Sequence, residues 1–399
     1  MKIQVVENVY WVGAIDWNVR NFHGYTYTTH RGTTYNAYLI LDEKIALVDT
    51  VAAEFTEEMV KGIKELVDPA EIDFVIANHG EVDHSGAIPT IMELAPQATL
   101  VGTAKVQETL SRYFGPRDWQ WQTVRTGDEI SLGQRGLTFI EAPMLHWPDS
   151  MFTYLPEERL LLPNDAFGQH IATSQRFADE IDKWVVFDEA AKYYANILWP
   201  FSRLVLRKLE EVQKMGIEIA TIAPSHGLIW RGDPGLGDIL QAYIRWARGE
   251  AEPRAVIVYE TMWGSTERIA RAIAQGIMEE GSEVVVRGLP MSDRSDVIKE
   301  LLEARGLLVG SSTHNNDMLL NIAAFMEDLK GLRPIGKIGA AFGSHGWAGR
   351  AVERLGQALQ EASVDVVDEG FSFQFAPDAD ELAQAVEFGR KFARKLKAT

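Results

Sequence analysis

The first hundred residues alternate between strand-like and helix-like patterns of hydrophobic and polar positions. Two apolar runs on either side of a charged turn at residues 42–44 predict a β-hairpin over residues 36–50. A helical pattern over 53–66, an apolar strand over 72–77 and a second helical stretch over about 85–94 follow. Because strands and helices alternate, the pattern favours a layered α/β domain.

The pattern changes over residues 129–162 to short apolar runs separated by turn residues: EISLG, LTFIEAP, MFTYL and RLLLP. These runs predict the strands of a second sheet. Further along, the polar segment RWARGEAEPR contains Gly249 and Pro253 and lies between a helical pattern and a new strand. We therefore place a domain boundary there, with one domain over residues 1–250 and another over 251–399.

The second of these domains reads as a regular series of strands and helices. The predicted strands cover 255–259, 283–287, 306–310 and 338–342, and the predicted helices cover 267–279, 294–303, 322–329 and 351–362. Parallel strands need crossover connections, which are usually helices. The alternation therefore predicts a doubly wound parallel sheet.

The composition narrows the kinds of protein and of site. No stretch approaches the roughly 18 apolar residues of a membrane span, and residues 1–22 carry charges where a signal peptide is apolar, so we expect a cytoplasmic protein. A net charge of -18 disfavours binding to nucleic acid or to anionic membranes. Since the sequence contains no cysteine, any metal must be held by nitrogen and oxygen ligands.

Four metal-ligating residue types occur within six positions after the predicted strand 72–77, in the segment NHGEVDHSG. Alternate side chains of a turn can converge on one side, so His79, Glu81 and Asp83 can face a common centre, with His84 beside them at the start of the next helix. Four such groups are costly to desolvate together without a metal or a counter-charge. The segment therefore predicts a metal site.

Single ligand-type residues follow three later apolar runs: His146 in APMLHWPDS, Asp165 in LLLPNDAFG and His226 in APSHG. A lone histidine in such a place is more often structural, and only the cluster favours ligation. The order H-x-E-x-D-H, then His, Asp and His, resembles the binuclear site of the metallo-β-lactamase fold. Zinc hydrolases of that fold usually carry a histidine where Glu81 stands. The carboxylate suits iron better, although this region alone leaves a hydrolase open.

Five further residues lie in segments next to these candidates. His23 and His30, in the aromatic segment NFHGYTYTTHRGTTYN, and His170 are interpreted as structural residues or as partners of the ligands. Tyr25 and Tyr193 are candidates to donate phenolic hydrogen bonds into the same pocket as catalytic residues, with an ordinary core position as the alternative.

The second domain contains three loops suited to a flavin nucleotide. TMWGSTERIA runs from a strand into a helix whose N-terminus offers partial positive charge to a phosphate, and its spacing resembles the flavodoxin loop, with Trp263 in place of a common threonine. The loops SSTHNND and GSHGWAG also follow strands, at the ends where open α/β sheets bind ligands. Since no G-x-G-x-x-G turn is present, FMN fits better than FAD. The candidate FMN-binding residues are Thr261, Met262, Trp263, Gly264, Ser265, Thr266, Ser312, Thr313, His314, Asn315, Ser344, Gly346 and Trp347.

Taken over essentially its full length, the chain resembles the flavodiiron family, the A-type flavoproteins. The resemblance implies a metallo-β-lactamase-like αββα domain followed by a flavodoxin-like domain, with FMN and two iron ions. It assigns His79, Glu81, His146 and a bridging Asp165 to one iron, and Asp83, His84, the same Asp165 and His226 to the other. A position beside the ligands is the alternative for His84.

The same resemblance implies the reaction and the partners. The reaction is the reduction of nitric oxide to nitrous oxide, of dioxygen to water, or of both, with electrons from rubredoxin or a similar small protein passing through FMN. The implied assembly is a head-to-tail homodimer, or a dimer of dimers, in which the FMN of one subunit meets the diiron site of the other. Two alternatives are a zinc-type hydrolase with an appended flavodoxin-like domain and an electron carrier with a vestigial metal site. A hydrolase has no use for FMN, which favours redox chemistry.

Overall fold

The computed structural model describes residues 3–233 and 235–398, and its chain forms two compact units. Unit 1 comprises Met1–Phe22, Thr29–Tyr194 and Arg203–Tyr243, and unit 2 comprises His23–Thr28, Ala195–Ser202 and Ile244–Thr399, apart from the few residues outside the described ranges. Two short stretches of the N-terminal half therefore pack with the C-terminal half. In the described part of the chain, no helix is both long and apolar enough to cross a membrane.

The first sheet of unit 1 has seven strands in the order β1-β2-β7-β8-β9-β10-β11. The four strands β1, β2, β7 and β8 pair antiparallel, whereas β8, β9, β10 and β11 pair in parallel. The predicted hairpin over residues 36–50 is confirmed, since β7 and β8 pair across its turn. The strands are β1 (Ile3–Val6), β2 (Val9–Trp11), β7 (Tyr38–Ile40), β8 (Ile45–Val48), β9 (Ile72–Ile76), β10 (Thr99–Gly102) and β11 (Gln120–Thr123).

The second sheet of unit 1 has six strands in the order β12-β13-β14-β15-β16-β17, and its first four strands match the four predicted apolar runs. Buried side chains of both sheets, such as Val48 and Ile76 of the first and Phe139 and Leu162 of the second, belong to one hydrophobic core. The strands are β12 (Glu129–Ser131), β13 (Gly136–Glu141), β14 (Met151–Leu155), β15 (Leu160–Leu162), β16 (Thr221–Ile222) and β17 (Trp230–Arg231). Outside these two sheets, β3 (Ala14–Asp16) pairs with β6 (Thr33–Tyr35), and β4 (Asn21–Phe22) pairs with β5 (Tyr27–Thr28).

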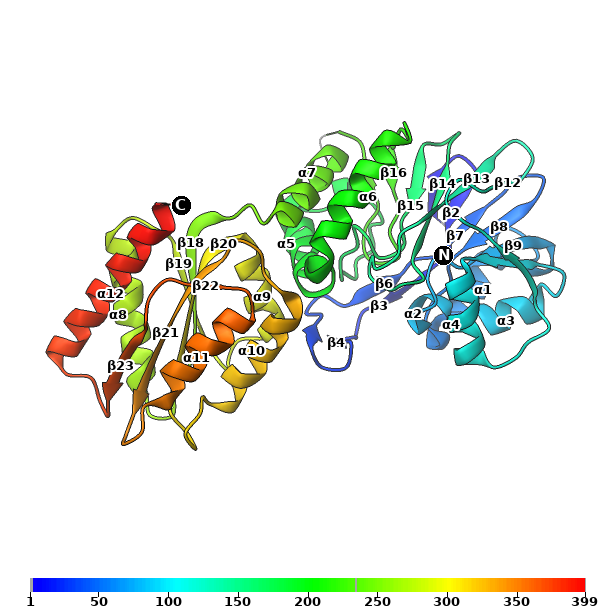
Figure 1. Ribbon diagram of the computed structural model, residues 1–399. Helices are drawn as coiled ribbons and strands as arrows, with labels where there is room; N and C mark the ends of the chain where they lie inside the picture. Colours follow the sequence, from blue (N-terminus) through cyan, green and yellow to red (C-terminus); the bar gives the residue numbers. More distant parts are fainter. Residues whose placement is uncertain (1–2, 234, 399) are drawn as a thin grey trace. The chain divides into compact units, whose positions relative to one another are not determined.

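Helices cover the outer faces of these two sheets, as Figure 1 shows, which confirms the αββα layering. Helices α1 (Thr56–Lys64), α3 (Ile88–Leu94) and α4 (Ala104–Phe114) lie beside the first sheet, and α5 (Lys183–Tyr193), α6 (Ser202–Lys214) and α7 (Gly235–Arg248) lie beside the second. The helix predicted over about 85–94 is in fact two helices, α2 (Val82–Ser85) and α3. Pro89 lies in the first turn of α3 and has no N–H to continue a helix from α2. Asp83 and His84 consequently lie inside α2, rather than in the turn and at the start of the next helix.

Unit 2 contains a parallel sheet in the order β19-β18-β20-β21-β22, with β23 also pairing with β21. Helices α8 and α12 cover one face and α9, α10 and α11 the other (Figure 1), which confirms the doubly wound prediction. The strands are β18 (Glu252–Glu260), β19 (Val284–Gly288), β20 (Ala304–Ser312), β21 (Ile338–His345), β22 (Asp365–Val366) and β23 (Phe371–Gln374). The helices are α8 (Ser265–Glu279), α9 (Arg294–Glu303), α10 (Leu320–Leu332), α11 (Arg350–Glu361) and α12 (Ala379–Lys397).

Helix α12 was not among the predicted elements, although it packs closely on α8. A Cβ at Gly276 of α8 would lie 1.9 Å from the carbonyl oxygen of Val386, and one at Gly389 of α12 would lie 2.1 Å from that of Ile273. Only glycine permits this approach of two helix backbones. The start of α12 could have been predicted from the sequence, because Asp378 and Glu381 form a capping box.

Candidate functional site

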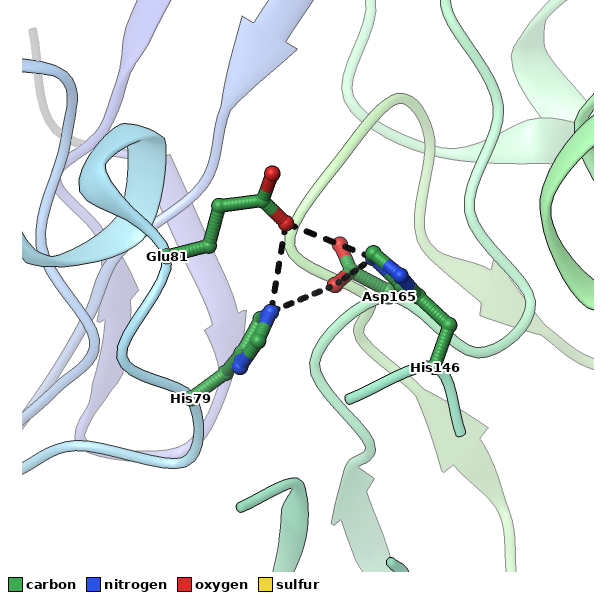
Figure 2. Close-up of side chains that lie close together, drawn as sticks. All are labelled: His79, Glu81, His146 and Asp165. Atoms are coloured by element: carbon green, nitrogen blue, oxygen red, sulfur yellow. Dashed lines mark hydrogen bonds and ion pairs between the residues drawn. The ribbon is translucent and has the colours of Figure 1, made fainter. Parts of the chain in front are cut away.

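Seven side chains with metal-ligating atoms meet in unit 1, and they form two groups. Within each group, the potential ligand atoms all lie within 4.8 Å of one another. Figure 2 shows the side chains of the first group pointing toward a common centre. The first group consists of His79, Glu81, His146 and Asp165, and the second of Asp83, His84 and His226. The structure thus brings together all seven predicted ligands, and their binding of metal stays a prediction.

Asp165 lies between the groups and turns one carboxylate oxygen toward each. Its Oδ2 is 3.2 Å from His146 Nε2 and 3.7 Å from His79 Nε2. Its Oδ1 is 3.0 Å from His84 Nε2 and 3.6 Å from His226 Nε2. This is the placement of a carboxylate that bridges two metal ions, as the resemblance implies for this residue.

Glu81 belongs to the first group alone. Its Oε2 lies 3.3 Å from His79 Nε2 and 3.4 Å from His146 Nε2 (Figure 2). The loop between β9 and α2 carries Glu81, so the side chain reaches the cluster from the end of the first sheet. This half of the site therefore consists of two imidazoles, the carboxylate of Glu81 and one oxygen of Asp165.

Asp83 is the carboxylate that belongs to the second group alone, as Glu81 belongs to the first. Its Oδ2 is 3.2 Å from His226 Nε2, and its Oδ1 is 3.5 Å from His84 Nε2. The two groups therefore match in ligand type, each with two imidazoles and one carboxylate of its own besides the shared Asp165. Such a mixed set of nitrogen and oxygen donors fits a pair of iron ions.

Hydrogen bonds outside the cluster orient two of its imidazoles. His79 Nδ1 is 2.8 Å from Asp149 Oδ1, while Asp149 Oδ2 accepts a 3.1 Å hydrogen bond from the Gly80 amide. His226 Nδ1 donates to the Thr34 carbonyl at 2.7 Å. Because Nδ1 is held by an acceptor in each case, Nε2 is the ring atom that faces the cluster and would ligate a metal. Sequence reasoning missed Asp149 and Thr34, since their distance along the chain from these histidines hides the pairing.

The cluster has a shortage of positive charge that a metal would relieve. Among the described residues, the buried atoms Asp83 Oδ1, His84 Nε2 and Asp165 Oδ2 make no hydrogen bond, which is costly for buried polar groups. Burial lowers the pKa of His84, but the carboxylates of Asp83 and Asp165 outweigh this effect and raise the pKa to about 9. Burial raises the pKa of Asp165, but His84 and His146 hold it well below its usual value. The residues therefore fit metal ions, whose charge would replace that of protonated imidazole.

We expect Asp149→Ala to weaken metal binding without removing any predicted ligand. The substitution takes away the acceptor that holds His79 Nδ1, so the ring can rotate and change its tautomer. Loss of such a partner costs about 10- to 100-fold in metal affinity. Titration with Fe(II) under anaerobic conditions measures the effect, with the exposed Asp118→Ala as control. Equal affinities for the two variants would show that Asp149 does not orient the ligand.

Tyr193 and His170 lie beside the second group. The Tyr193 ring is buried, 5.1 Å from the His170 ring and 6.2 Å from the His226 ring. Burial and the neighbouring Asp165 carboxylate raise the pKa of Tyr193 well above its ordinary value, so the phenol keeps its proton. His170 Nδ1 is 2.8 Å from Thr33 Oγ1. Both residues therefore lie next to the predicted ligands, and their roles there stay predictions.

Tyr25 belongs to unit 2. Its side chain is 85% exposed and lines a hollow, together with Leu289 and Pro290 of unit 2. The loop that carries Tyr25 is anchored within unit 2, because Thr28 bonds to Ser295 of α9 through both its amide, at 3.2 Å, and its hydroxyl, at 2.8 Å. The role of Tyr25 as a hydrogen-bond donor stays a prediction.

Unit 2 has a cavity of about 460 Å³ at the carboxyl ends of β18, β20 and β21. The side chains of Trp263 and Trp347, both 93% exposed, give it flat aromatic walls, and serine hydroxyls supply polar groups. Its volume and lining suit a flavin mononucleotide, whose ring is flat and whose edge accepts hydrogen bonds. Its lining residues are Met262, Trp263, Ser265, Ser312, Ser344, His345, Gly346, Trp347, Phe375 and Ala376.

Seven of the predicted FMN-binding residues line this cavity, and His345, Phe375 and Ala376 were missed. The last two follow β23, a strand that the sequence patterns did not predict. The other six predicted residues, Thr261, Gly264, Thr266, Thr313, His314 and Asn315, are not in the lining. The Thr266 hydroxyl lies 3.0 Å from that of Ser312 and 2.9 Å from that of Ser344. The Thr266 side chain is fully buried beside two serines of the lining, and its contact with FMN stays a prediction.

We expect Gly264→Val to weaken FMN binding and leave iron content unchanged. Gly264 is the N-cap of α8 with φ +84°, a conformation that costs a β-branched residue about 1–3 kcal/mol. The loop can relieve this strain only by moving, which displaces the α8 N-terminus predicted to hold the phosphate. A drop in FMN affinity of about tenfold follows. Fluorescence titration of flavin measures it, with Gly356→Val as control, because Gly356 has open space and no positive φ. Unchanged affinity in Gly264→Val would place the phosphate elsewhere.

Comparisons with known proteins match both halves of the chain. The profile of the ODP family beta lactamases matches residues 33–227, and the flavodoxin profile matches residues 257–389. A nitric oxide reductase of Moorella thermoacetica is 53% identical over 99% of this chain and 98% of its own length. The rubredoxin oxygen:oxidoreductase of Desulfovibrio gigas superimposes with a TM-score of 0.97 at 38% identity, covering 100% of this chain and 99% of that one. The flavodiiron protein of Giardia intestinalis gives a TM-score of 0.96 at 36% identity, over 100% and 97% of the two chains.

Proposed function

Since this chain belongs to the flavodiiron protein family, we propose that it is an oxidoreductase that reduces nitric oxide to nitrous oxide, dioxygen to water, or both. The observation that carries this proposal is the position of Asp165, with one oxygen toward each of two matched ligand groups. The same chain has an aromatic-walled cavity suited to FMN. A hydrolytic enzyme needs no such redox cofactor, so the pair of sites favours gas reduction.

The protein residues hold and orient the reacting groups. When bound, FMN supplies electrons and the two irons supply the place where the gas is reduced. The proposed ligands are His79, Glu81, His146 and Asp165 for one iron, and Asp83, His84, His226 and the same Asp165 for the other. The carboxylates of Glu81, Asp83 and Asp165 carry three negative charges, which balance most of the charge of two divalent ions.

Trp263 and Trp347 are the residues that we propose to pack against the flavin ring. Their side chains lie in the lining of one cavity and are largely exposed in this chain, so both faces are open to a flat ligand. Ser312 and Ser344, also in the lining, can hydrogen-bond to the ring edge.

Electrons entering this site need an external donor, for which we propose rubredoxin or a related small redox protein. The naming of the Desulfovibrio gigas relative as a rubredoxin oxygen:oxidoreductase supports that choice.

We also propose a head-to-tail homodimer, in which the FMN of one subunit lies against the diiron site of its partner. The two sites lie in different units of the chain, and each opens at the strand ends of its own sheets. A two-fold axis would bring unlike sites together twice in one dimer.

Two further proposals are the domain boundary near residue 250 and a cytoplasmic location. The change of unit between Tyr243 and Ile244 supports the first.

Metal analysis of the purified protein tests the proposal against hydrolysis. Gas reduction requires two irons per chain, whereas the zinc-type hydrolase requires two zincs. The protein is produced with iron and zinc both in the medium, and bound metal and FMN are measured on the same sample. Two irons with one FMN support the reductase. Two zincs, with hydrolytic activity and flavin reoxidation no faster than that of free reduced FMN with either gas, would replace it with the hydrolase.

A further inference from the structure

An apolar cavity of about 30 Å³ lies in unit 1 between the second sheet and helices α6 and α7. Phe152 of β14 and Leu161 of β15 form its inner wall, and Val205 of α6 lies opposite in the fully buried part. Leu209 of α6 and Leu240 of α7 are only half-buried and mark the side nearer the surface. The cavity thus extends inward from the two helices that cover this sheet.

The cavity is connected through the chain to two residues of the metal-ligating cluster, both of the first group. Leu145 and Ala166 belong to its lining, and they are the immediate sequence neighbours of His146 and Asp165. One residue of main chain in each of two loops therefore separates the cavity from the ligands. The small side chain of Ala166 leaves the least bulk at this boundary.

The polar groups of the lining residues hydrogen-bond to other protein groups, so the surface that faces the cavity is apolar. Lys208 Nζ donates to the Glu141 carbonyl at 2.5 Å and to the Glu211 carboxylate at 2.7 Å, so only its aliphatic stem faces the gap. The Tyr243 hydroxyl accepts the Phe167 amide at 2.6 Å. A water molecule needs two to four polar partners, and a cavity lined in this way stays dry and binds xenon or apolar molecules instead.

We propose that this cavity binds a small uncharged gas molecule of two heavy atoms and delivers it between the two loops to the cluster. The inference rests on the proposed function, because nitric oxide and dioxygen are the substrates in question. Dioxygen is apolar and nitric oxide only weakly polar, so both molecules prefer an apolar site to water. A cavity of about 30 Å³ exceeds the roughly 10–15 Å³ that a water-sized molecule requires, so a diatomic gas fits. The site concentrates substrate beside the ligands while water stays out.

Xenon tests the binding without any catalytic turnover. Crystals of the iron-loaded, FMN-bound protein are pressurised with xenon, and the expected result is one xenon atom between Val205 and the loops of Leu145 and Ala166. Val205→Phe fills the gap from the α6 side and should abolish that site. Leu204→Phe adds a ring to a half-buried position on the same helix outside the lining and should keep it. Absence of xenon from the wild-type cavity overturns the proposal.

Steady-state kinetics test the delivery. In Val205→Phe, KM for the gas should rise about threefold or more with kcat unchanged, while Leu204→Phe behaves as wild type. Leu209→Ala, which widens the outer side, should retain xenon and lower or preserve KM, so the test survives a failure of Val205→Phe to fold. Loss of xenon with no change in KM would contradict delivery. A wild-type protein that binds xenon here but reduces neither gas would refute the proposed function alone.

Discussion

Asp165→Ala is expected to lose both metals and all gas-reducing activity while keeping its FMN. The substitution removes one ligand from each of the two groups, since Oδ2 faces His79 and His146 and Oδ1 faces His84 and His226. It also removes the negative charge at the centre of four imidazoles, so two divalent ions would repel each other with less compensation. Metal content should fall from two per chain to near zero. Loss of a bridging ligand is the largest single effect that this site allows.

Asp118→Ala is the matched control, because that aspartate is exposed and lies outside the cluster. The cavity of unit 2 is formed by other residues, so flavin content should be equal in the two variants. Metal and flavin are measured on the same samples by elemental analysis and absorbance. Two irons retained in Asp165→Ala would show that the bridge is made by another group. One iron retained would show that Asp165 serves a single metal.

Mixing Asp165→Ala with Gly264→Val from which the weakened FMN has been removed is expected to restore about a quarter of wild-type turnover. Asp165→Ala keeps the flavin site and Gly264→Val keeps the metal site, so a mixed dimer has one intact flavin–iron pair across its interface. With random subunit exchange about half of the dimers are mixed, and each has one working site of two. Activity should thus rise from near zero in either variant alone. Such recovery is possible only when electrons cross between subunits.

The control for this experiment is a double variant, Asp165→Ala with Gly264→Val, mixed with wild type under the same conditions. Its mixed dimers carry one intact flavin and one intact iron site in the same subunit, so transfer across the interface gives them no working pair. Subunit exchange is verified with differently tagged chains. If exchange is complete and the two single variants stay inactive together, electrons move within one chain and the head-to-tail arrangement is wrong.

The alternating strand and helix patterns were enough to predict most of the layered architecture. Helix α9, for example, has the predicted bounds, because each apolar run in this half is a separate buried element. The predictions failed where local signals were weaker than tertiary contacts. The strand β23 has four residues, of which only Phe373 is buried, so its apolar pattern is faint. Pairing with β21 determines its conformation.

The metal cluster was predictable because ligand-type residues follow strands, where buried carboxylates and imidazoles need a counter-charge. The partners of the ligands were not, since no periodicity links His79 to Asp149, 70 residues away. Thr266 shows the reverse case. Its hydroxyl-rich turn suggested direct contact with phosphate, which stays a prediction, while the contacts of this hydroxyl with two distant serines were not foreseen. Sequence spacing identifies which loops carry chemistry, whereas side-chain direction depends on packing in the folded chain.

Reoxidation of the reduced flavin is the most direct measurement of the central claim that the two sites form one gas-reducing enzyme. The protein is loaded with iron, its FMN is reduced anaerobically with a chemical reductant, and nitric oxide or dioxygen is added in separate stopped-flow experiments. The account predicts rapid return of oxidised-flavin absorbance with at least one gas, together with nitrous oxide or water as product, and no such fast phase in Asp165→Ala. Equal flavin reoxidation rates in the wild type and Asp165→Ala with both gases would contradict it, because the metal cluster would then take no part.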